Sequence, residues 1–430
     1  MVPRLMVILS TLTLLAVGLV MVYSSSSITS YVEAGDAMGE AVKQLLFAAI
    51  GAAFALGVIL FVKQDFMRGT GGLIFWGICS LFLLLTPLIG TSALGAKRWI
   101  LLGPISIQIS EFLKIALVIM AARIAEDYRE GGLSYGSLAL RVAVFIIFPL
   151  GFMFLSQSDL GTTMICVVGL FTVMVCAGLS GRAIAALFIL VVAVAIVAVV
   201  SSGYRSDRFI FLDPWSDEQD TGYQLIHSFK ALASGGLIGS GIGNSYEKML
   251  WLPEAETDFI FAIIGEELGF VGAAVVVLAF VAFLYGGYSI AREASTPFGA
   301  FVAAGLTTMC VFQAFLNIAC VIGIAPTTGK PLPFISSGGS SLISSLLLVG
   351  VILAISFDSH NEGEYRQRRD NLRVVSSSSQ PGRARRTSAE GCRDRSARAM
   401  GEEARAPRAA GNGKTSFPSS AADRLRTPRR

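Results

Sequence analysis

Long apolar runs recur along most of this chain, and they constrain its fold more than any other feature. A helix needs roughly 20 mainly apolar residues to cross the hydrocarbon core of a bilayer. Runs of this kind lie at 5–23, 45–62, 73–90, 112–125, 142–156, 160–178, 182–201, 261–289, 298–322 and 341–357. The pattern predicts an all-α polytopic membrane protein with about ten transmembrane helices.

Composition also favours lipid as the solvent. Hydrophobic residues make up 53% of the 430 residues and charged residues only 15%, whereas a soluble domain carries about 25% charged residues. The six cysteines and two histidines show no zinc-ligand spacing, so buried free thiols are the simplest interpretation. The net charge of +4 does not indicate a nucleic-acid partner, because the basic excess lies in one terminal segment.

That terminal segment, 358–430, holds 17 Lys and Arg against 9 Asp and Glu. It has almost no large apolar residue, so we predict a disordered basic tail after a membrane domain at 1–357. Its arginines either contact anionic lipid head groups or stay solvated. The basic charge predicts a cytoplasmic C-terminus, and an even number of spans then makes the N-terminus cytoplasmic too. The outer loops are in that case 91–111, 157–159, 202–258 and 323–340.

Two cations beside an indole form the first polar motif, in the first long outer loop. Lys97 and Arg98 precede Trp99 at a predicted membrane edge, which suits an anionic lipid or a diphosphate. The same residues fit a simple interfacial anchor with snorkelling cations equally well. Glu111 and Lys114 follow, and their spacing of three places them on one helix face, where they can pair. Ionisable residues at or inside a span are expensive, which favours a functional role.

Carboxylates stand at the starts of two later spans. Asp159 fits either a helix N-cap or a catalytic group. Asp258 ends the longest outer loop, where it either caps the next helix or acts as a general base whose pKa is raised by partial desolvation. Glu266 and Glu267 lie about two turns further on, and an ordinary span would avoid both. A glycine-rich run at 235–243 in the same loop lacks the spacing of a nucleotide-binding motif.

The segment 329–341 reads GKPLPFISSGGSS. Its prolines and paired glycines force irregular backbone before the last apolar run. Such backbone is tolerated at membrane depth only where protein or water covers it. We predict a re-entrant element that lines a cavity, with Ser336 and Ser337 as candidate substrate-binding residues.

Together these segments resemble the SEDS family (shape, elongation, division and sporulation). The resemblance runs from the first span to about residue 357 and rests on ordered motifs, which are GAKRWI, SEFLK, QSDLGTT, GYQLIHS, SGGLIGSGIGNS, LPEAETDFIFAIIGEELG and KPLPFISSGGSSL. The wording of GNSYEK, LPEA and IGEELG is closer to the cell-division branch than to the elongation branch. The resemblance implies ten spans, with a long extracellular loop before the eighth and the Gly/Pro-rich segment before the tenth.

The resemblance also implies an activity and a set of partners. They are those of a peptidoglycan glycosyltransferase that polymerises lipid II at the septum, in the bacterial plasma membrane, beside a class B penicillin-binding transpeptidase and other divisome proteins. The essential carboxylate of the family maps onto Asp258. The conserved acid and cation of the SEFLK block map onto Glu111 and Lys114. The arginine before the tryptophan maps onto Arg98, and the aspartate of QSDLGT onto Asp159.

Three positions depart from the usual family pattern. Glu256 stands where relatives usually have His, Ser337 where they usually have Tyr, and Ile109 where Pro commonly precedes the SEF sequence. None of these changes removes a carboxylate or cation named above. We expect Glu256 to raise the pKa of Asp258 through like-charge repulsion.

The implied chemistry fits these residues. A sugar hydroxyl must attack an anomeric carbon while a lipid diphosphate leaves, so one base must take a proton and cations must offset the growing charge. Asp258 serves as the base, with Arg98 and also Lys97 and Lys114 as candidates to face the diphosphate. Because the donor sugar is α-linked and the product bond is β, one inverting displacement suffices. A divalent cation, Mg or Mn, beside the diphosphate is chemically plausible, although the sequence demonstrates no site.

Three other functions stay open at this stage. A lipid II flippase would use the same lipid-accessible cavity, but it predicts inverted repeats that the sequence does not show. A non-catalytic divisome scaffold would leave Asp258 replaceable. An elongation paralogue would perform the same chemistry in the lateral wall.

Overall fold

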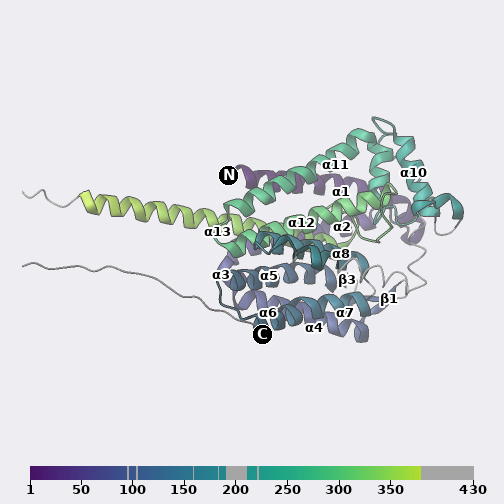
Figure 1. The fold of residues 1–430 in the computed structure, drawn as a ribbon. Helices are drawn as coiled ribbons and strands as arrows, with labels where there is room; N and C mark the ends of the chain where they lie inside the picture. Colours follow the sequence, from purple (N-terminus) through teal and green to yellow (C-terminus); the bar gives the residue numbers. More distant parts are fainter. Residues whose placement is uncertain are drawn as a thin grey trace, which may run out of the picture. The chain divides into compact units, whose positions relative to one another are not determined.

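The computed structural model describes residues 1–93, 96–102, 105–157, 159–182, 184–189, 211–219 and 222–378 (Figure 1). Within these ranges, the side chains at 33–34, 92–97, 102–105 and 361–378 are outside the description.

Helices dominate the described chain. In chain order they are α1 (Val2–Ala34), α2 (Gly39–Phe61), α3 (Gln64–Arg68), α4 (Thr70–Ile89), α5 (Ile109–Arg129), α6 (Tyr135–Val142), the π-helix η1 (Ala143–Ile147), α7 (Phe148–Ser156), α8 (Leu160–Cys176), the 3₁₀-helix η3 (Pro214–Asp217), α10 (Tyr223–Gly235), α11 (Ile260–Glu293), α12 (Pro297–Val321) and α13 (Gly339–Ser378). The long helices lie side by side in one bundle within the unit Met1–Val374 (Figure 1).

Seven helical stretches of the described chain are long and apolar enough to cross a membrane. They are α1, α2, α4, the α6–α7 stretch, α11, α12 and the first part of α13. Helix α8 is apolar but shorter, and α5 is long but carries charged residues on its buried face. Nine of the ten predicted runs therefore coincide with helices, and most of the run at 182–201 lies outside the described residues. The chain is a multi-pass membrane protein, and this set is compatible with ten spans.

The last helix is longer than the sequence predicts. The predicted tail begins at 358, whereas α13 continues to Ser378. The helix carries on because residues 359–378 contain no proline and only one glycine to stop it. The remainder of the predicted tail, 379–430, lies outside the described residues.

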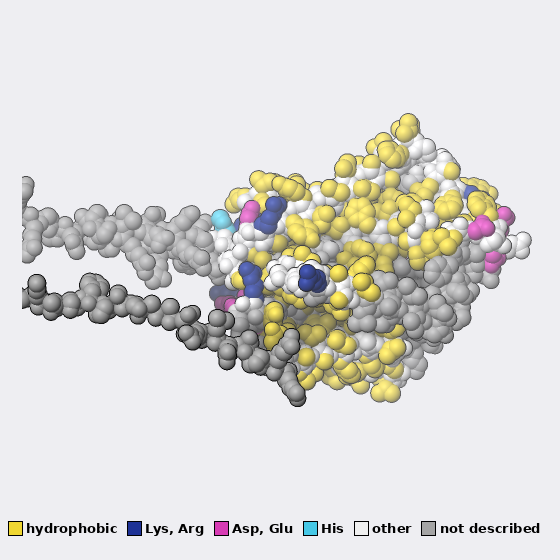
Figure 2. Space-filling view, viewed as in Figure 1, with side chains coloured by type: hydrophobic (Ala, Val, Ile, Leu, Met, Phe, Trp, Pro, Cys, Tyr) yellow, Lys and Arg dark blue, Asp and Glu magenta, His cyan; other side chains and the backbone are white. Residues whose placement is uncertain are grey.

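The surface of the bundle matches a lipid environment. Apolar side chains cover its flank, while charged side chains gather mainly at its two ends (Figure 2). Helices α2 and α4 expose large apolar residues along their length, among them Leu45, Phe54, Ile74 and Ile78. In contrast, α12 is buried on most of its sides and forms the centre of the core. Apolar residues that face outward are stable only where the solvent is also apolar.

A small antiparallel sheet lies between α4 and α5, where the sequence predicts only an outer loop. Its strands are β1 (Thr91–Ala93), β2 (Ala96–Leu102) and β3 (Ile105–Gln108), in the order β1-β2-β3. Trp99 on β2 pairs with Gln108 on β3. Because β3 leads directly into α5, the sheet holds Arg98 near the N-terminal end of that helix.

The Gly/Pro-rich segment between α12 and α13 is irregular and largely buried, as the sequence predicts. Lys330, Phe334 and Ser336 are each at most 4% exposed. Helix α1 covers the segment so closely that a Cβ added to Gly18 would lie 2.6 Å from the Phe334 carbonyl oxygen. Packed protein thus shelters the irregular backbone.

Candidate active site

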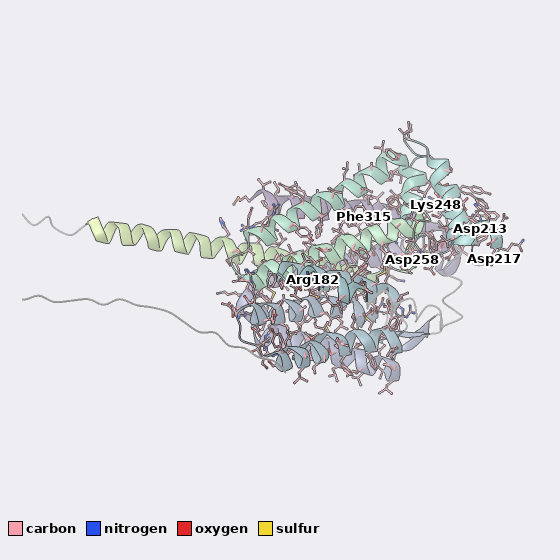
Figure 3. The ribbon with its side chains drawn as sticks, in the orientation of Figure 1. Arg182, Asp213, Asp217, Lys248, Asp258 and Phe315 are labelled. Carbon is pink, nitrogen blue, oxygen red and sulfur yellow. The ribbon has the colours of Figure 1, made fainter. Side chains whose placement is uncertain are left out.

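Asp258 lies in the last turn before α11, at the end of the bundle that also holds Asp213 and Asp217 (Figure 3). Local turns shape this segment, because the amides of Thr257 and Phe259 both donate to the Glu254 carbonyl oxygen, each at 3.2 Å. The Asn317 side chain of α12 donates to the backbone oxygens of Asp258 and Lys330, both at 2.8 Å. One amide therefore joins the Asp258 loop to the irregular segment.

Two serines of the irregular segment strengthen that junction. Ser336 Oγ donates to the Thr257 carbonyl oxygen at 2.6 Å, and the Ser337 amide donates to the Glu256 carbonyl oxygen at 2.8 Å. The sequence proposes both serines as substrate-binding residues. In the structure the Ser336 hydroxyl fixes the backbone beside Asp258, and substrate binding by either serine stays a prediction.

Backbone strain is concentrated in these two loops. Leu250, Glu254 and Phe334 are the non-glycine residues with positive φ in the described chain, at 67°, 56° and 68°. Two precede Asp258 in its own loop, and the third lies in the segment bonded to that loop. Such conformations cost about 1–3 kcal/mol each and persist where the surroundings impose them, often at functional sites.

The Asp258 carboxylate is half-buried against Gly329, where an added Cβ would lie 3.5 Å from Oδ2. Burial and the negative charge of Glu254 raise the pKa of Asp258 to about 6, and Lys330 partly opposes this. The sequence predicts that Glu256 raises this pKa, which stays a prediction. The acid whose charge raises it in the structure is Glu254. A carboxyl with this pKa is ionised at neutral pH and still basic enough to accept a proton.

Asp159 is the N-cap of α8 and also the centre of a buried charge cluster. The Thr162 amide donates to Oδ1 at 3.1 Å, and Lys330 Nζ, Gln108 Nε2 and Thr162 Oγ1 donate to Oδ2 at 2.9, 3.1 and 2.9 Å. Burial raises the pKa of Asp159, but the positive charge of Lys330, these donors and Arg98 outweigh it and hold that pKa below its usual range. The N-cap interpretation of Asp159 is confirmed, and a direct part in catalysis stays a prediction.

Glu111 and Lys114 form a buried ion pair in the first turns of α5, as the sequence predicts. Lys114 Nζ lies 2.7 Å from Glu111 Oε2 and donates to Gln313 Oε1 at 2.8 Å. The Ser344 hydroxyl donates to Glu111 at 3.2 Å. With both side chains at most 3% exposed, Lys114 does not present its charge at the surface. Gln313 links Lys114 to the irregular segment, because its amide nitrogen donates to the Pro331 carbonyl oxygen at 3.0 Å.

Of the two cations before Trp99, the structure describes the side chain of Arg98 alone. Arg98 is half-buried on β2, and its Nε donates to the Gln157 carbonyl oxygen at 2.7 Å. This contact joins the sheet to the turn before Asp159. The side chain of Lys97 lies outside the described residues.

Lys330 is the main residue that the sequence interpretation leaves out. It is 4% exposed, and its charge reaches both Asp159 and Asp258. A sequence signal exists, because this lysine is the only charged residue of the proline-containing segment 329–341. Gln313 and Asn317 carry a similar signal, since two polar residues four apart share one face of the apolar helix α12.

The arrangement places the half-buried carboxylate of Asp258 near the cation of Lys330, and Arg98 lies near Asp159, the partner of Lys330. That combination suits a reaction in which a hydroxyl loses its proton while negative charge develops on a leaving group. No group of three His, Cys, Asp or Glu side chains that could hold a metal is found in the described part of the chain. The described residues therefore form no metal cage of their own.

Comparison with known proteins identifies the family. The model of the FtsW/RodA/SpoVE family, described as cell cycle proteins, matches residues 4–361. The chain belongs to this family. It is 38% identical to stage V sporulation protein E of Bacillus subtilis over 82% of this chain and 97% of the relative. It is 37% identical to a protein named probable peptidoglycan glycosyltransferase FtsW from Taylorella equigenitalis, over 79% of this chain and 95% of the relative.

Solved structures share the fold. A chain from a structure described as a peptidoglycan synthase complex that coordinates polymerization and crosslinking has a TM-score of 0.67 at 24% identity, over 82% of this chain and 97% of that chain. The rod shape determining protein RodA of Thermus thermophilus has a TM-score of 0.60 at 22% identity, over 82% and 96%.

Proposed function

We propose that this chain is a peptidoglycan glycosyltransferase that polymerises lipid II, with Asp258 as its general base. The observation that carries the proposal is the half-buried Asp258 carboxylate, whose pKa is raised to about 6 beside the cation of Lys330. Family membership and the names of the relatives support the reaction class.

The reaction requires one bond to form as another breaks. A hydroxyl oxygen of the acceptor sugar attacks the anomeric carbon of the donor, and Asp258 takes the hydroxyl proton. The bond from that carbon to the lipid diphosphate breaks, and the electron pair leaves with the diphosphate. Lys330 and Arg98 stabilise the charge that develops there. Inversion from the α-linked donor to a β product needs no second nucleophile.

The network around the base keeps these groups in place. Asp159 holds Lys330, while Asn317 and Ser336 hold the Asp258 backbone. The Glu111–Lys114 pair is linked to the irregular segment by Gln313, which bonds both Lys114 and the Pro331 carbonyl oxygen. Because misplacement by about 1 Å can cost 10²-fold in rate, this scaffold is part of the catalytic function.

Cellular setting and partners extend the proposal. The C-terminal basic charge supports cytoplasmic termini and an outward-facing Asp258. We place the enzyme at the division septum, on the wording of its motifs, with a class B penicillin-binding transpeptidase as partner. This chain shares its fold with a chain of a peptidoglycan synthase complex, which supports the proposal of such a partner.

A divalent cation is proposed only as a companion of the substrate diphosphate, because the described residues offer no cage for it. No step above depends on it. Polymerisation measured with added Mg²⁺ or Mn²⁺ and after chelation tests this point.

The decisive experiment supplies lipid II to the purified protein with a transpeptidase partner and resolves glycan strands on a gel. Asp258→Asn and Asp258→Ala are expected to lower the rate by about 10²–10⁴-fold, the usual contribution of a general base. Asp213→Asn, an exposed acid of the same outer region, serves as the matched control and retains activity. All variants are first checked for folding and partner binding.

If both Asp258 variants make polymer at the wild-type rate, Asp258 is not the general base. If no version polymerises while wild-type vesicles move lipid II between leaflets, a transporter function replaces the enzyme.

A further inference from the structure

Helix α11 is interrupted at Gly269, whose backbone has φ 66° and ψ −165°. The break prevents the amides of Phe270 and Val271 from bonding within the helix, and they donate instead to the carbonyl oxygens of Gly236 and Leu237, at 3.0 and 3.1 Å. A separate short helix, from Ile260 to the break, therefore follows directly on Asp258.

The glycine-rich run of the outer loop fills this break. The amides of Ser240 and Gly241 donate to the carbonyl oxygens of Glu266 and Glu267, at 2.9 and 3.0 Å. These are the oxygens that a continuous helix would have used for Phe270 and Val271. The loop thus replaces the helical hydrogen bonds that the kink removes.

Only glycine permits such an approach. A Cβ on Gly239 would lie 2.1 Å from the Glu267 carbonyl oxygen, and one on Gly235 would lie 1.8 Å from the Gly265 carbonyl oxygen. The run at 235–243 therefore owes its composition to close backbone packing. Its function is to dock the loop onto the broken helix.

A buried charge cluster secures the docked loop. Lys248 Nζ lies 2.8 Å from Glu267 Oε1, and the two side chains are 3% and 0% exposed. Ser24 of α1 donates to both carboxylate oxygens of Glu267, at 2.8 and 2.7 Å, and lies 3.0 Å from Lys248 Nζ. The neighbouring Glu266 accepts from the Ser245 hydroxyl and from the Tyr246 amide, the latter at 2.8 Å.

The cluster fixes both sides of Asp258. Lys248 lies ten residues before Asp258, at the start of the strained loop, and Glu267 lies nine residues after it, at the end of the short helix. Figure 3 shows Lys248 and Asp258 at the same end of the bundle. Buried charges attract each other more strongly than charges in water. The Lys248–Glu267 pair therefore holds the loop before Asp258 to the end of the short helix after it.

We propose that Lys248 is a positioning residue for the glycosyl transfer. Through its buried pair with Glu267 and Ser24, it holds the strained loop and the short helix so that the Asp258 carboxylate stays against Gly329. This inference rests on the proposed role of Asp258 as the base.

The test compares Lys248→Met, Lys248→Arg and Ser24→Ala with wild type in steady-state lipid II polymerisation between pH 4.5 and 8. Lys43→Met is the matched control, because Lys43 is an exposed lysine paired with Glu40 on α2. We expect Lys248→Met to lower kcat by about 10–100-fold with little change in KM for lipid II. Lys248→Arg keeps the charge and retains most activity. The kcat of Ser24→Ala is expected to lie between those of Lys248→Met and Lys248→Arg.

The pH profile separates positioning from a merely structural role. Asp258 acts when ionised, so activity falls as pH drops through its pKa. Release of the loop exposes Asp258 to water, which lowers its pKa towards the ordinary aspartate value of 3.8 and moves the acid limb to lower pH. A loss of folded protein lowers the plateau and leaves the acid limb in place.

The proposal is overturned if Lys248→Met, or Ser24→Ala where Lys248→Met does not fold, keeps the wild-type kcat and acid limb. It is also overturned if activity falls only in proportion to folded protein. Asp258→Asn is measured in parallel, and wild-type activity there would refute the base instead. Faster hydrogen exchange at 249–268 in the Lys248 variant tests the tie itself, independently of catalysis.

Discussion

Asp159 and Asp258 are two aspartates on either side of one lysine, and the protein gives them different properties. Asp159 is buried among donors that keep it ionised, whereas Asp258 is half-buried beside Glu254, which makes its carboxylate easier to protonate. The Lys330 ammonium is bound to the first and only near the second. Opposed environments of this kind assign one carboxylate a fixed charge and the other a proton-transfer role.

In the proposed mechanism, a buried anion supports catalysis without exchanging a proton itself. Asp159 holds Lys330 in place, and Lys330 then keeps the pKa of Asp258 from rising further. Sequence position does not distinguish these roles, because both aspartates lie within two residues of the start of an apolar helix.

The largest effect on this comparison is expected from Lys330→Met. The variant removes the cation shared by the two carboxylates and leaves Asp159 buried without its partner. We expect a loss of about 10²–10³-fold in kcat, the range found when a charge-stabilising donor is removed. The acid limb of the pH profile moves to higher pH, because the cation that lowers the pKa of Asp258 is gone. A full-rate variant with an unchanged limb would contradict this assignment.

Asp159→Asn removes the negative charge of the Lys330–Asp159 ion pair. Asparagine preserves the N-cap of α8, so the change isolates the charge. We expect a destabilisation of about 3–5 kcal/mol, as for other broken buried pairs, and a roughly 10–100-fold lower kcat because Lys330 is no longer positioned. Thermal unfolding in detergent and the polymerisation assay measure the two effects. Stability and rate at wild-type values would show that Lys330 does not need Asp159.

Ser336 and Ser337 give a matched pair with a smaller effect. Ser336→Ala removes a hydroxyl that fixes the Thr257 backbone, at a cost of about 1 kcal/mol for a net hydrogen bond, and we expect a few-fold lower rate. Ser337→Ala leaves its backbone hydrogen bond to Glu256 intact and should change little. Equal and large losses in both would instead indicate direct contact between both hydroxyls and substrate.

The smallest effect on rate is expected from Glu254→Gln, which changes the pH dependence of activity rather than its plateau. Removal of this negative charge lowers the pKa of Asp258 from about 6 towards 3.8. The acid limb therefore moves to lower pH, while the rate at pH 7.5 stays near wild type because Asp258 is ionised there in both proteins. An acid limb that stays in place in Glu254→Gln would contradict the role of this charge.

The helices could be predicted because hydrophobic run length is a local property. Nine predicted runs coincide with described helices, and the pairing of Glu111 with Lys114 followed from their spacing. The sheet β1–β3 was missed because its short strands are stabilised by pairing with each other and by the helices around them. The roles of Lys330 and Gln313 were missed for a related reason, since their partners are distant in the chain.

The sequence by itself determined a bundle of apolar helices and the position of Asp258 at the start of one of them. Family resemblance added the reaction that this residue is proposed to serve. Only the tertiary structure decided which charges meet: Lys330 with Asp159, Glu254 with Asp258, and Lys248 with Glu267 across the break in α11. The physical reason is that hydrophobic burial acts along each segment, whereas the energy of a buried charge depends on the distance and orientation of partners brought together by the fold.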